Sequence, residues 1–337
     1  MRPLTSKRLA WVCGGLLGVL LLVVGLSLKM GAVPISMTDF MTSLGRNVLF
    51  GEELPSEFRM IVNEIRLPRI LLGILVGAAL SVAGAGFQAL LRNPLADPYV
   101  LGVSSGAALG AILSLIITTH ATAAMPFAAF AGACATIAAV YFLGRRSGQL
   151  DSYTLLLGGI VSASFLSAVI MFLMTTLSGR DLRGMAFWLM GDLSTPIPMD
   201  LKWLFLLVIV AVGAIYTTAA DLNLLLTGEQ EAVHLGVDVA RVKLVVYISA
   251  SLLTGLAVSV SGAIGYVGLL VPHAVRMVFG SDYRVLIPAT AIGGAILIVV
   301  ADTVARTIVA PTELPVGAMT AMAGAPMFLY LLRRRLQ

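Results

Sequence analysis

The sequence predicts an all-α protein that crosses a membrane about ten times. Hydrophobic residues make up 59% of its 337 residues and charged residues only 12%, whereas a soluble domain carries roughly 25% charged residues. A membrane-spanning helix needs about 20 predominantly apolar residues, and ten apolar runs follow one another along the chain. This composition excludes a soluble enzyme, a nucleic-acid-binding protein and a disordered regulator as the main interpretation.

The first apolar run, from Leu9 to Leu28, follows a basic N-terminus and is longer than the apolar core of a signal peptide. We therefore expect an uncleaved span, with cleavage near Ser27 as the alternative. The mixed segment from Met30 to Asn63 is expected to be an aqueous loop. Nine further spans are expected at 65–91, 98–118, 125–144, 152–176, 201–219, 243–264, 267–280, 285–309 and 316–332.

Basic residues favour a cytoplasmic location for both termini. If the N-terminus is inside and the chain crosses ten times, 13 of the 22 Lys and Arg residues fall on the cytoplasmic side. Arg145 and Arg146, and the triplet at 333–335, directly abut predicted spans, where the positive-inside rule applies most strongly. The basic residues left on the opposite side are more than the rule favours, so some of them are expected to have a function.

An internal repeat predicts two halves of opposite orientation. The segments Gly77–Gly102 and Gly255–Gly280, which are 178 residues apart, are identical at 11 of 26 positions. They begin in the second and the seventh span, five crossings apart, so the two copies enter the membrane in opposite directions. We therefore expect spans 2–5 and 7–10 to form an inverted repeat, an architecture typical of transporters.

A few polar residues lie in or beside the apolar runs, where they are costly and often functional: Gln88, Asn93, Asp97, His273 and Asp302. Asp97 is expected to cap the third span. His273 follows Pro272, and satisfying backbone groups freed by the proline is favoured over a proton relay. Asp302 and Arg306 are four apart, and pairing within the span is one of two open interpretations. None of these residues has metal-ligand or hydrolytic spacing, so we predict neither a catalytic nor a metal-binding residue.

The longest polar cytoplasmic segment, Asp221–Lys243, contains a short amphipathic stretch. The chain has no G-x-x-x-x-G-K-[S/T] loop to hold phosphates, so any ATP it uses must be hydrolysed on another chain. Ala232, Val233 and Leu235 could insert into a partner's groove. Packing of the same stretch against its own bundle is the alternative, and the residues alone do not decide between the two.

Several motifs resemble those of a known family of permeases. Ile65–Arg69, Asn93–Pro98, Gly262–His273 and Glu313–Gly317 are similar, in the same order, to segments of the permease subunits of ABC importers for iron-siderophores, haem and cobalamin. The resemblance covers nearly the whole chain. It implies a type II ABC importer permease fold with one transmembrane domain over residues 1–337, in the bacterial cytoplasmic (inner) membrane.

The resemblance also implies partners. It predicts a homodimer that works with two cytoplasmic ATPase subunits and an extracytoplasmic solute-binding protein, and it predicts no nucleic-acid partner. The chain itself is then not an enzyme and binds no cofactor, because ATP-Mg is bound by the ATPase. The imported substrate is expected to be a metal chelate.

Three groups of site residues are carried over from the family. The cytoplasmic gate is predicted at Asn93, Leu95, Ser152 and Tyr153. The contact with the ATPase is predicted at Gly228, Glu229, Glu231, Ala232, Leu235 and Gly236, within the coupling segment 221–243. Exposed arginines that receive acidic residues of the binding protein are predicted at Arg66, Arg69 and Arg306; snorkelling of such arginines to lipid headgroups is the alternative.

The bulky Tyr153 departs from the small hydroxyl pair of cobalamin permeases, so an iron-siderophore or haem is favoured over cobalamin. An ion-coupled secondary transporter is the alternative function, but only Asp302 and Asp97 are available as buried carboxylates. An intramembrane enzyme would need a catalytic pair, and the Ser and His residues show no such spacing.

Overall fold

The structure of the chain is a computed structural model that describes residues 6–31, 42, 60–117, 121–146, 149–177, 179–194 and 200–335. Most of the expected loop from Met30 to Asn63 lies outside these residues. The elements are α1 (Ser6–Lys29), η1 (Met60–Arg66), α4 (Leu67–Leu90), η2 (Pro98–Leu101), α5 (Val103–Ile117), α6 (Ala121–Gly144), β1 (Arg145–Arg146), β2 (Gln149–Leu150), α7 (Ser152–Met174), α8 (Gly179–Leu189), α9 (Leu201–Thr217), α10 (Ala219–Leu225), α11 (Glu229–His234), α12 (Val239–Ser261), α13 (Val267–Phe279), α14 (Tyr283–Ala305) and α15 (Val316–Arg335).

Each of the ten predicted apolar runs is helical, which confirms the all-α fold class. By length and composition, six helices in the described ranges could cross a membrane: α1, η1 with α4, α6, α7, α12 and α14. The pair α9 and α10, bent by 49°, would make a seventh. Three shorter apolar helices, α5, α13 and the first part of α15, cover the remaining runs. The number of full crossings stays a prediction.

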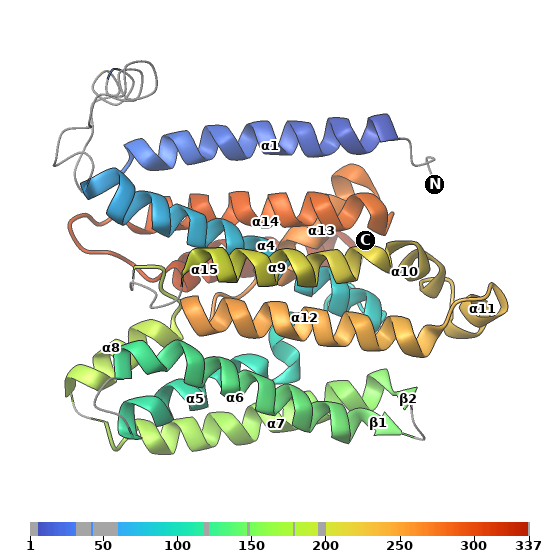
Figure 1. Cartoon of the computed structure of the whole chain (residues 1–337), viewed down its shortest axis with the longest axis horizontal. Helices are drawn as coiled ribbons and strands as arrows, with labels where there is room; N and C mark the ends of the chain where they lie inside the picture. Colours follow the sequence, from blue (N-terminus) through green and yellow to red (C-terminus); the bar gives the residue numbers. More distant parts are fainter. Residues whose placement is uncertain are drawn as a thin grey trace.

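The long helices lie roughly side by side and alternate in direction (Figure 1). The helix α4 starts at the end of the molecule where η1 lies, whereas α12 starts at the opposite end, next to α11. These two helices carry the starts of the two repeat copies, so their opposite directions agree with the inverted repeat. We call the end with α10, α11 and the β1–β2 hairpin the coupling end, and the opposite end the outer end.

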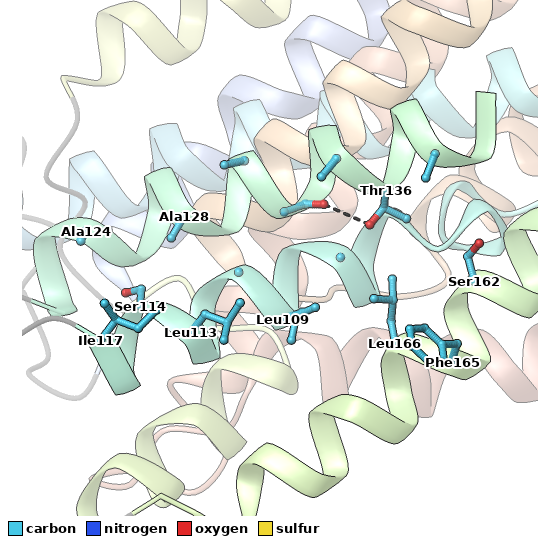
Figure 2. Close-up of a pocket in the computed structure, with 16 residues that line it drawn as sticks. Leu109, Leu113, Ser114, Ile117, Ala124, Ala128, Thr136, Ser162, Phe165 and Leu166 are labelled. Carbon is cyan, nitrogen blue, oxygen red and sulfur yellow. Dashed lines mark hydrogen bonds between the residues drawn. The ribbon is translucent and has the colours of Figure 1, made fainter. Parts of the chain in front are cut away.

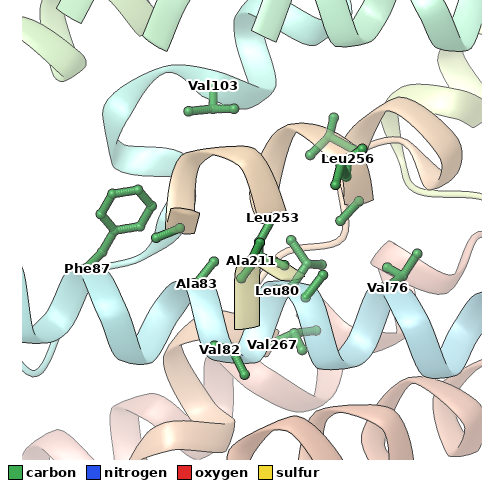
Figure 3. Packing of buried hydrophobic residues seen from close by; sticks show 14 of the residues in the cluster. Val76, Leu80, Val82, Ala83, Phe87, Val103, Ala211, Leu253, Leu256 and Val267 are labelled. Atoms are coloured by element: carbon green, nitrogen blue, oxygen red, sulfur yellow. The ribbon is translucent and has the colours of Figure 1, made fainter. Parts of the chain in front are cut away.

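The helix α4 forms the centre of the bundle, where it packs against α12, α13 and α14. Val76, Leu80 and Phe87 of α4 lie among Leu253 of α12 and Val267 of α13, all of them buried (Figure 3). In a bilayer the surroundings are as apolar as the core, so helices associate mainly through close packing of small residues rather than through hydrophobic burial.

Glycines set how closely α4 approaches its neighbours. A Cβ at Gly84 would overlap the carbonyl of Gly268 in α13, and a Cβ at Gly77 would overlap the carbonyl of Gly294 in α14. Both positions therefore require glycine for the observed packing.

The seventh predicted span ends earlier than expected. The helix α12 stops at Ser261 instead of residue 264, because Gly262 takes φ +64°, whereas α13 begins at Val267, as predicted, and contains Pro272. A break at membrane depth leaves backbone groups that need partners. The hydroxyl of Tyr99 supplies them for Ile264, since it accepts from the amide at 2.9 Å and lies 3.0 Å from the carbonyl.

Candidate functional site

The predicted gate residues Asn93 and Leu95 lie in residues 91–97, the loop between α4 and η2 at the coupling end. The side chain of Asn93 accepts a hydrogen bond from the amide of Leu95 at 2.9 Å, and the side chain of Leu95 is 41% exposed. Asp97 caps η2 by accepting from the amide of Tyr99 at 2.9 Å, which confirms its predicted capping role. Burial raises the pKa of the Asp97 carboxyl to about 6.

Gln88 fixes this loop against α13. Its amide nitrogen donates to the carbonyl oxygens of Ala96 at 3.3 Å and Gly268 at 3.2 Å, and its oxygen accepts from Arg276 Nη1 at 2.6 Å. Only 2% of Gln88 is exposed. The sequence marked Gln88 as a costly polar residue but gave it no role, because its partners are 8 to 188 residues away along the chain.

The second predicted constriction, Ser152 and Tyr153, lies next to the first. Ser152 Oγ donates to the carbonyl of Leu90, the last residue of α4, at 3.1 Å. Asp151 caps α7 by accepting from the amide of Thr154 at 2.8 Å. The side chain of Tyr153 is 74% exposed. The structure therefore brings both predicted gate segments to the end of α4, whereas their closure of a path stays a prediction.

The coupling segment forms two short helices, α10 and α11, beyond the bundle (Figure 1). In α11 the side chain of Ala232 is fully buried against the chain itself, whereas Val233 is 58% and Leu235, just after the helix, 62% exposed. Gly236, at φ +86°, follows the helix. One side of the stretch therefore packs on its own bundle and the other side is exposed, whereas insertion into a partner stays a prediction.

Predicted coupling residues differ in their exposure. Glu231 is exposed, but Glu229 forms an ion pair with Lys243 at 2.7 Å.

Asn223 of α10 holds the neighbouring end of α14, since its amide donates to Asp282 at 2.8 Å. Arg284 donates to the same carboxylate and, through these hydrogen bonds, lowers the pKa of Asp282 to about 2.

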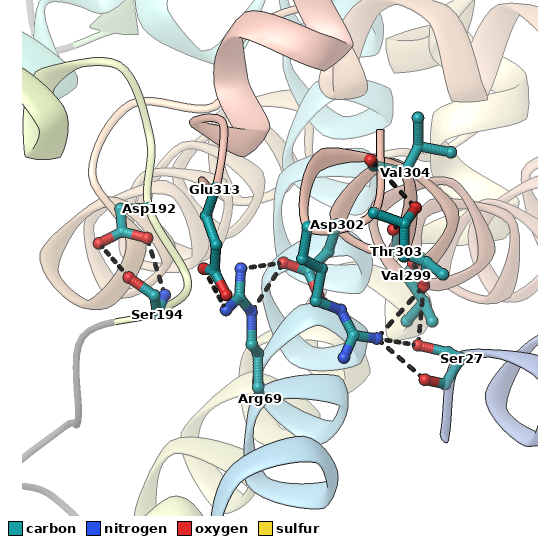
Figure 4. Close-up of polar contacts among 11 residues, drawn as sticks. Ser27, Arg69, Asp192, Ser194, Val299, Asp302, Thr303, Val304 and Glu313 are labelled. Atoms are coloured by element: carbon teal, nitrogen blue, oxygen red, sulfur yellow. Dashed lines mark hydrogen bonds and ion pairs between the residues drawn. The ribbon is translucent and has the colours of Figure 1, made fainter. Parts of the chain in front are cut away.

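At the outer end, ion pairs join α4 to α14 (Figure 4). Arg69 Nε donates to Asp302 Oδ1 at 2.9 Å, and Arg69 Nη1 donates to Glu313 Oε2 at 2.7 Å. Arg306 Nε lies 3.2 Å from Asp302 Oδ2, which confirms the predicted pairing within α14. Arg306 Nη2 also donates to Ser27 Oγ of α1 at 2.6 Å. We call Arg69, Asp302, Arg306 and Glu313 the outer ion cluster.

The three predicted docking arginines meet at this end, but the expectation that they are exposed is wrong. Arg66, Arg69 and Arg306 are only 4%, 9% and 4% exposed. Arg66 Nη1 donates to the carbonyl of Leu28 at 2.6 Å and to that of Lys29 at 3.1 Å, where α1 ends and its last carbonyls lack helical partners. All three guanidinium groups therefore serve contacts within the chain, and their role in docking stays a prediction.

A cavity of about 720 Å³ lies between α5, α6 and α7 (Figure 2). Its wall consists mainly of glycine, alanine and leucine, with polar atoms from Ser114, Thr136 and Ser162. The hydroxyl of Thr136 donates to the carbonyl of Gly132 at 3.0 Å, within its own helix. This surface suits hydrocarbon rather than a charged ligand.

Among the residues that the structure describes, no three His, Cys, Asp or Glu side chains are grouped as metal ligands would be.

Comparisons with known proteins agree with this architecture. The model of the FecCD transport family matches residues 19–334. The chain is 46% identical to a cobalamin import system permease protein of Halobacterium salinarum, over 84% of this chain and 76% of that protein. It is 40% identical to a haemin transport system permease protein of Yersinia pestis, over 95% of each.

A solved structure is similar as well. A metal-chelate type ABC transporter in an inward-facing conformation superposes with a TM-score of 0.79 at 29% identity, over 96% of this chain and 99% of that one. The two relatives are named as permease proteins of import or transport systems, and the similar structure is that of an ABC transporter. From the family match over most of the chain, the similar permeases and the shared fold, it follows that this protein belongs to the FecCD transport family and is a multi-pass ABC transporter permease subunit.

Proposed function

We propose that this chain imports a metal chelate as one half of a homodimer, together with two cytoplasmic ATPase subunits and an extracytoplasmic solute-binding protein. The names of the relatives, which handle cobalamin and haemin, support a metal-bearing macrocycle or chelate as the substrate class. ATP-Mg binds and is hydrolysed on the ATPase, and the permease provides the path. The protein resides in a bacterial inner membrane with both termini cytoplasmic.

One observation carries the proposal: an exposed apolar pair at the end of the short helix α11, one residue within the helix and one just after it, beyond the bundle. Val233 and Leu235 are more than half exposed, while Ala232 anchors the same helix to the chain. An exposed helix of this kind suits insertion into a partner's groove. The start of α1, the end of α4 that leads into the gate loop 91–97, and α11 lie toward this end (Figure 1), so we propose that the ATPase binds here and that this end is cytoplasmic.

Replacing Glu231 and Leu235 together by Ala tests the ATPase contact. We expect less ATPase to co-purify with the permease and less stimulated ATP hydrolysis, while membrane insertion is unchanged. Leu206→Ala is the matched control, because Leu206 is similarly exposed, at 48%, on α9 within the bundle. Equal recovery of the ATPase with both variants would refute binding at α11.

The docking of the binding protein is proposed at the opposite, outer end, near Arg66, Arg69 and Arg306. Because these arginines are buried and bonded, an acidic residue of the partner reaches them only by replacing a contact within the chain. Glu313 is the most accessible of these contacts, since its side chain is 42% exposed. Arg66→Glu with Arg69→Glu should slow association with the binding protein, and an unchanged on-rate at low salt would exclude the docking role.

The substrate is decided by uptake into vesicles that contain the assembled importer. Ferric siderophore, haemin and cobalamin are supplied separately with the binding protein and ATP. We expect ATP-dependent uptake of at least one chelate, with the iron compounds favoured by the bulky Tyr153. Uptake of none of them, from an importer whose ATPase is active, would contradict the proposed substrate class.

A further inference from the structure

Lys243 joins the coupling helix to the segment that leads into the second gate residues. It lies near the start of α12 and is only 6% exposed. Its Nζ forms an ion pair with Glu229 Oε1 of α11 at 2.7 Å and donates to the carbonyl of Leu150 in β2 at 3.3 Å. A buried ammonium group is costly unless it is paired and hydrogen-bonded, so these two contacts hold three segments at one point.

The far side of this contact leads directly to the gate. Leu150 is the last residue of β2 and is followed by Asp151, which caps α7. Ser152 comes next, and its hydroxyl donates to the carbonyl of Leu90 at the end of α4 at 3.1 Å. A displacement of α11 that moves Lys243 therefore shifts Leu150 through the hydrogen bond to its carbonyl, and Ser152 two residues further along the chain. The hydrogen bond from Ser152 to Leu90 passes the movement on to the end of α4, where the other predicted gate segment begins.

The surroundings of α11 make Lys243 the main polar connection. A cavity of about 560 Å³ lies between α11, β2 and the first turns of α12, with Glu229, Val233, His234 and Lys243 in its wall. In the described part of the chain, no other side-chain hydrogen bond or ion pair joins α11 to the bundle. The helix thus has space on one side and a single charged link to the gate segment.

We propose that Lys243 is a positioning residue that transmits movement of α11 to the gate segment 150–153. The proposal rests on the proposed function, because it assumes that the ATPase binds α11. Lys243 is inaccessible to that partner and acts only through Glu229 and the Leu150 carbonyl. Loss of the link should leave ATP hydrolysis in place and separate it from transport.

The test uses the complete importer, reconstituted in vesicles with its ATPase and binding protein, and measures ATP hydrolysed and chelate taken up in the same sample. We expect Lys243→Met to co-purify with the ATPase and to hydrolyse ATP, but to take up roughly 3- to 30-fold less chelate per ATP. Lys243→Arg, which keeps the charge, should retain most of the coupling. Lys202→Met is the control, because Lys202 is 89% exposed at the start of α9.

A second variant protects the test against a folding failure of Lys243→Met. Glu229→Gln leaves the buried lysine in place and should also lower uptake per ATP. The exchanged pair Glu229→Lys with Lys243→Glu should recover part of the coupling that each single charge reversal loses. Wild-type uptake per ATP in Glu229→Gln, or a loss of transport strictly proportional to lost assembly in Lys243→Met, would overturn the proposal. Absence of ATP-driven uptake by the wild type would instead refute the proposed function.

Discussion

Removal of the charge on Asp302 is the change from which we expect the largest loss of stability in the outer ion cluster. Asp302 is 2% exposed and contacts both Arg69 and Arg306, which are themselves at least nine-tenths buried. Taking one partner from a buried ion pair typically costs about 3–5 kcal/mol, because an uncompensated charge stays behind. Arg69 keeps Glu313 and Arg306 keeps Ser27, so we expect Asp302→Asn to lose about this amount and not twice as much.

The assay is thermal unfolding of the purified permease in lipid nanodiscs, followed by intrinsic fluorescence. At roughly 2–4 °C per kcal/mol, the melting temperature of Asp302→Asn should fall by roughly 6–20 °C. Glu313→Gln is the control: its side chain is 42% exposed, and an exposed ion pair contributes only about 0–1 kcal/mol. If the two variants melted at the same temperature, the buried pairing would not stabilise the outer end.

Three further changes test the interior and the gate loop. Gly84→Ala should abolish the folded, monodisperse protein in size-exclusion chromatography, because its Cβ overlaps the Gly268 carbonyl, whereas Gly213→Ala, with no atom within 4 Å, should be recovered normally. Burial raises the pKa of Asp97 to about 6, so the protonated carboxyl stabilises the fold fully below the unfolded pKa near 4, and this stabilisation is lost as the pH rises through 6. Asp97→Asn should therefore have a higher melting temperature than wild type at pH 7.5 but not at pH 4. Equal melting temperatures of variant and wild type at both pH values would contradict the raised pKa. Gln88→Leu removes its bonds to the carbonyls of Ala96 and Gly268 and should destabilise by about 1–3 kcal/mol, which an unchanged melting curve would contradict.

The positions of the helices were predictable because a chain in hydrocarbon must satisfy its backbone internally, so each long apolar run becomes a helix. The short helix α8 was missed because it lies in a polar connection and is amphipathic rather than apolar. The break between the seventh and eighth runs was predicted, but its start was placed after residue 264 instead of Ser261, since Gly262 looks like the small packing residues found elsewhere in the spans. Only the φ of +64° at Gly262 identifies where α12 ends.

Local features of the site were more predictable than distant ones. The Asp97 cap and the pairing of Asp302 with Arg306 depend on spacings of two and four residues, and both are confirmed. The Arg69–Asp302 contact joins residues 233 apart, and no spacing rule gives such a contact. For the same reason the sequence could not show that Arg69 faces the bundle: a basic residue at a span end looks the same whether it meets solvent or a carboxylate.

The central claim is that this chain provides the path for a metal chelate and that ATP hydrolysed on a separate subunit drives the transport. Uptake of a metal chelate into proteoliposomes tests this claim most directly. The vesicles contain the permease with its ATPase, receive the loaded binding protein, and are compared with and without ATP and with ionophores that collapse ion gradients. We predict uptake that requires ATP and the ATPase, that persists with the ionophores, and that is accompanied by no ATP hydrolysis from the purified permease alone. Uptake driven by an ion gradient without ATP, or ATP hydrolysis by the isolated chain, would contradict this.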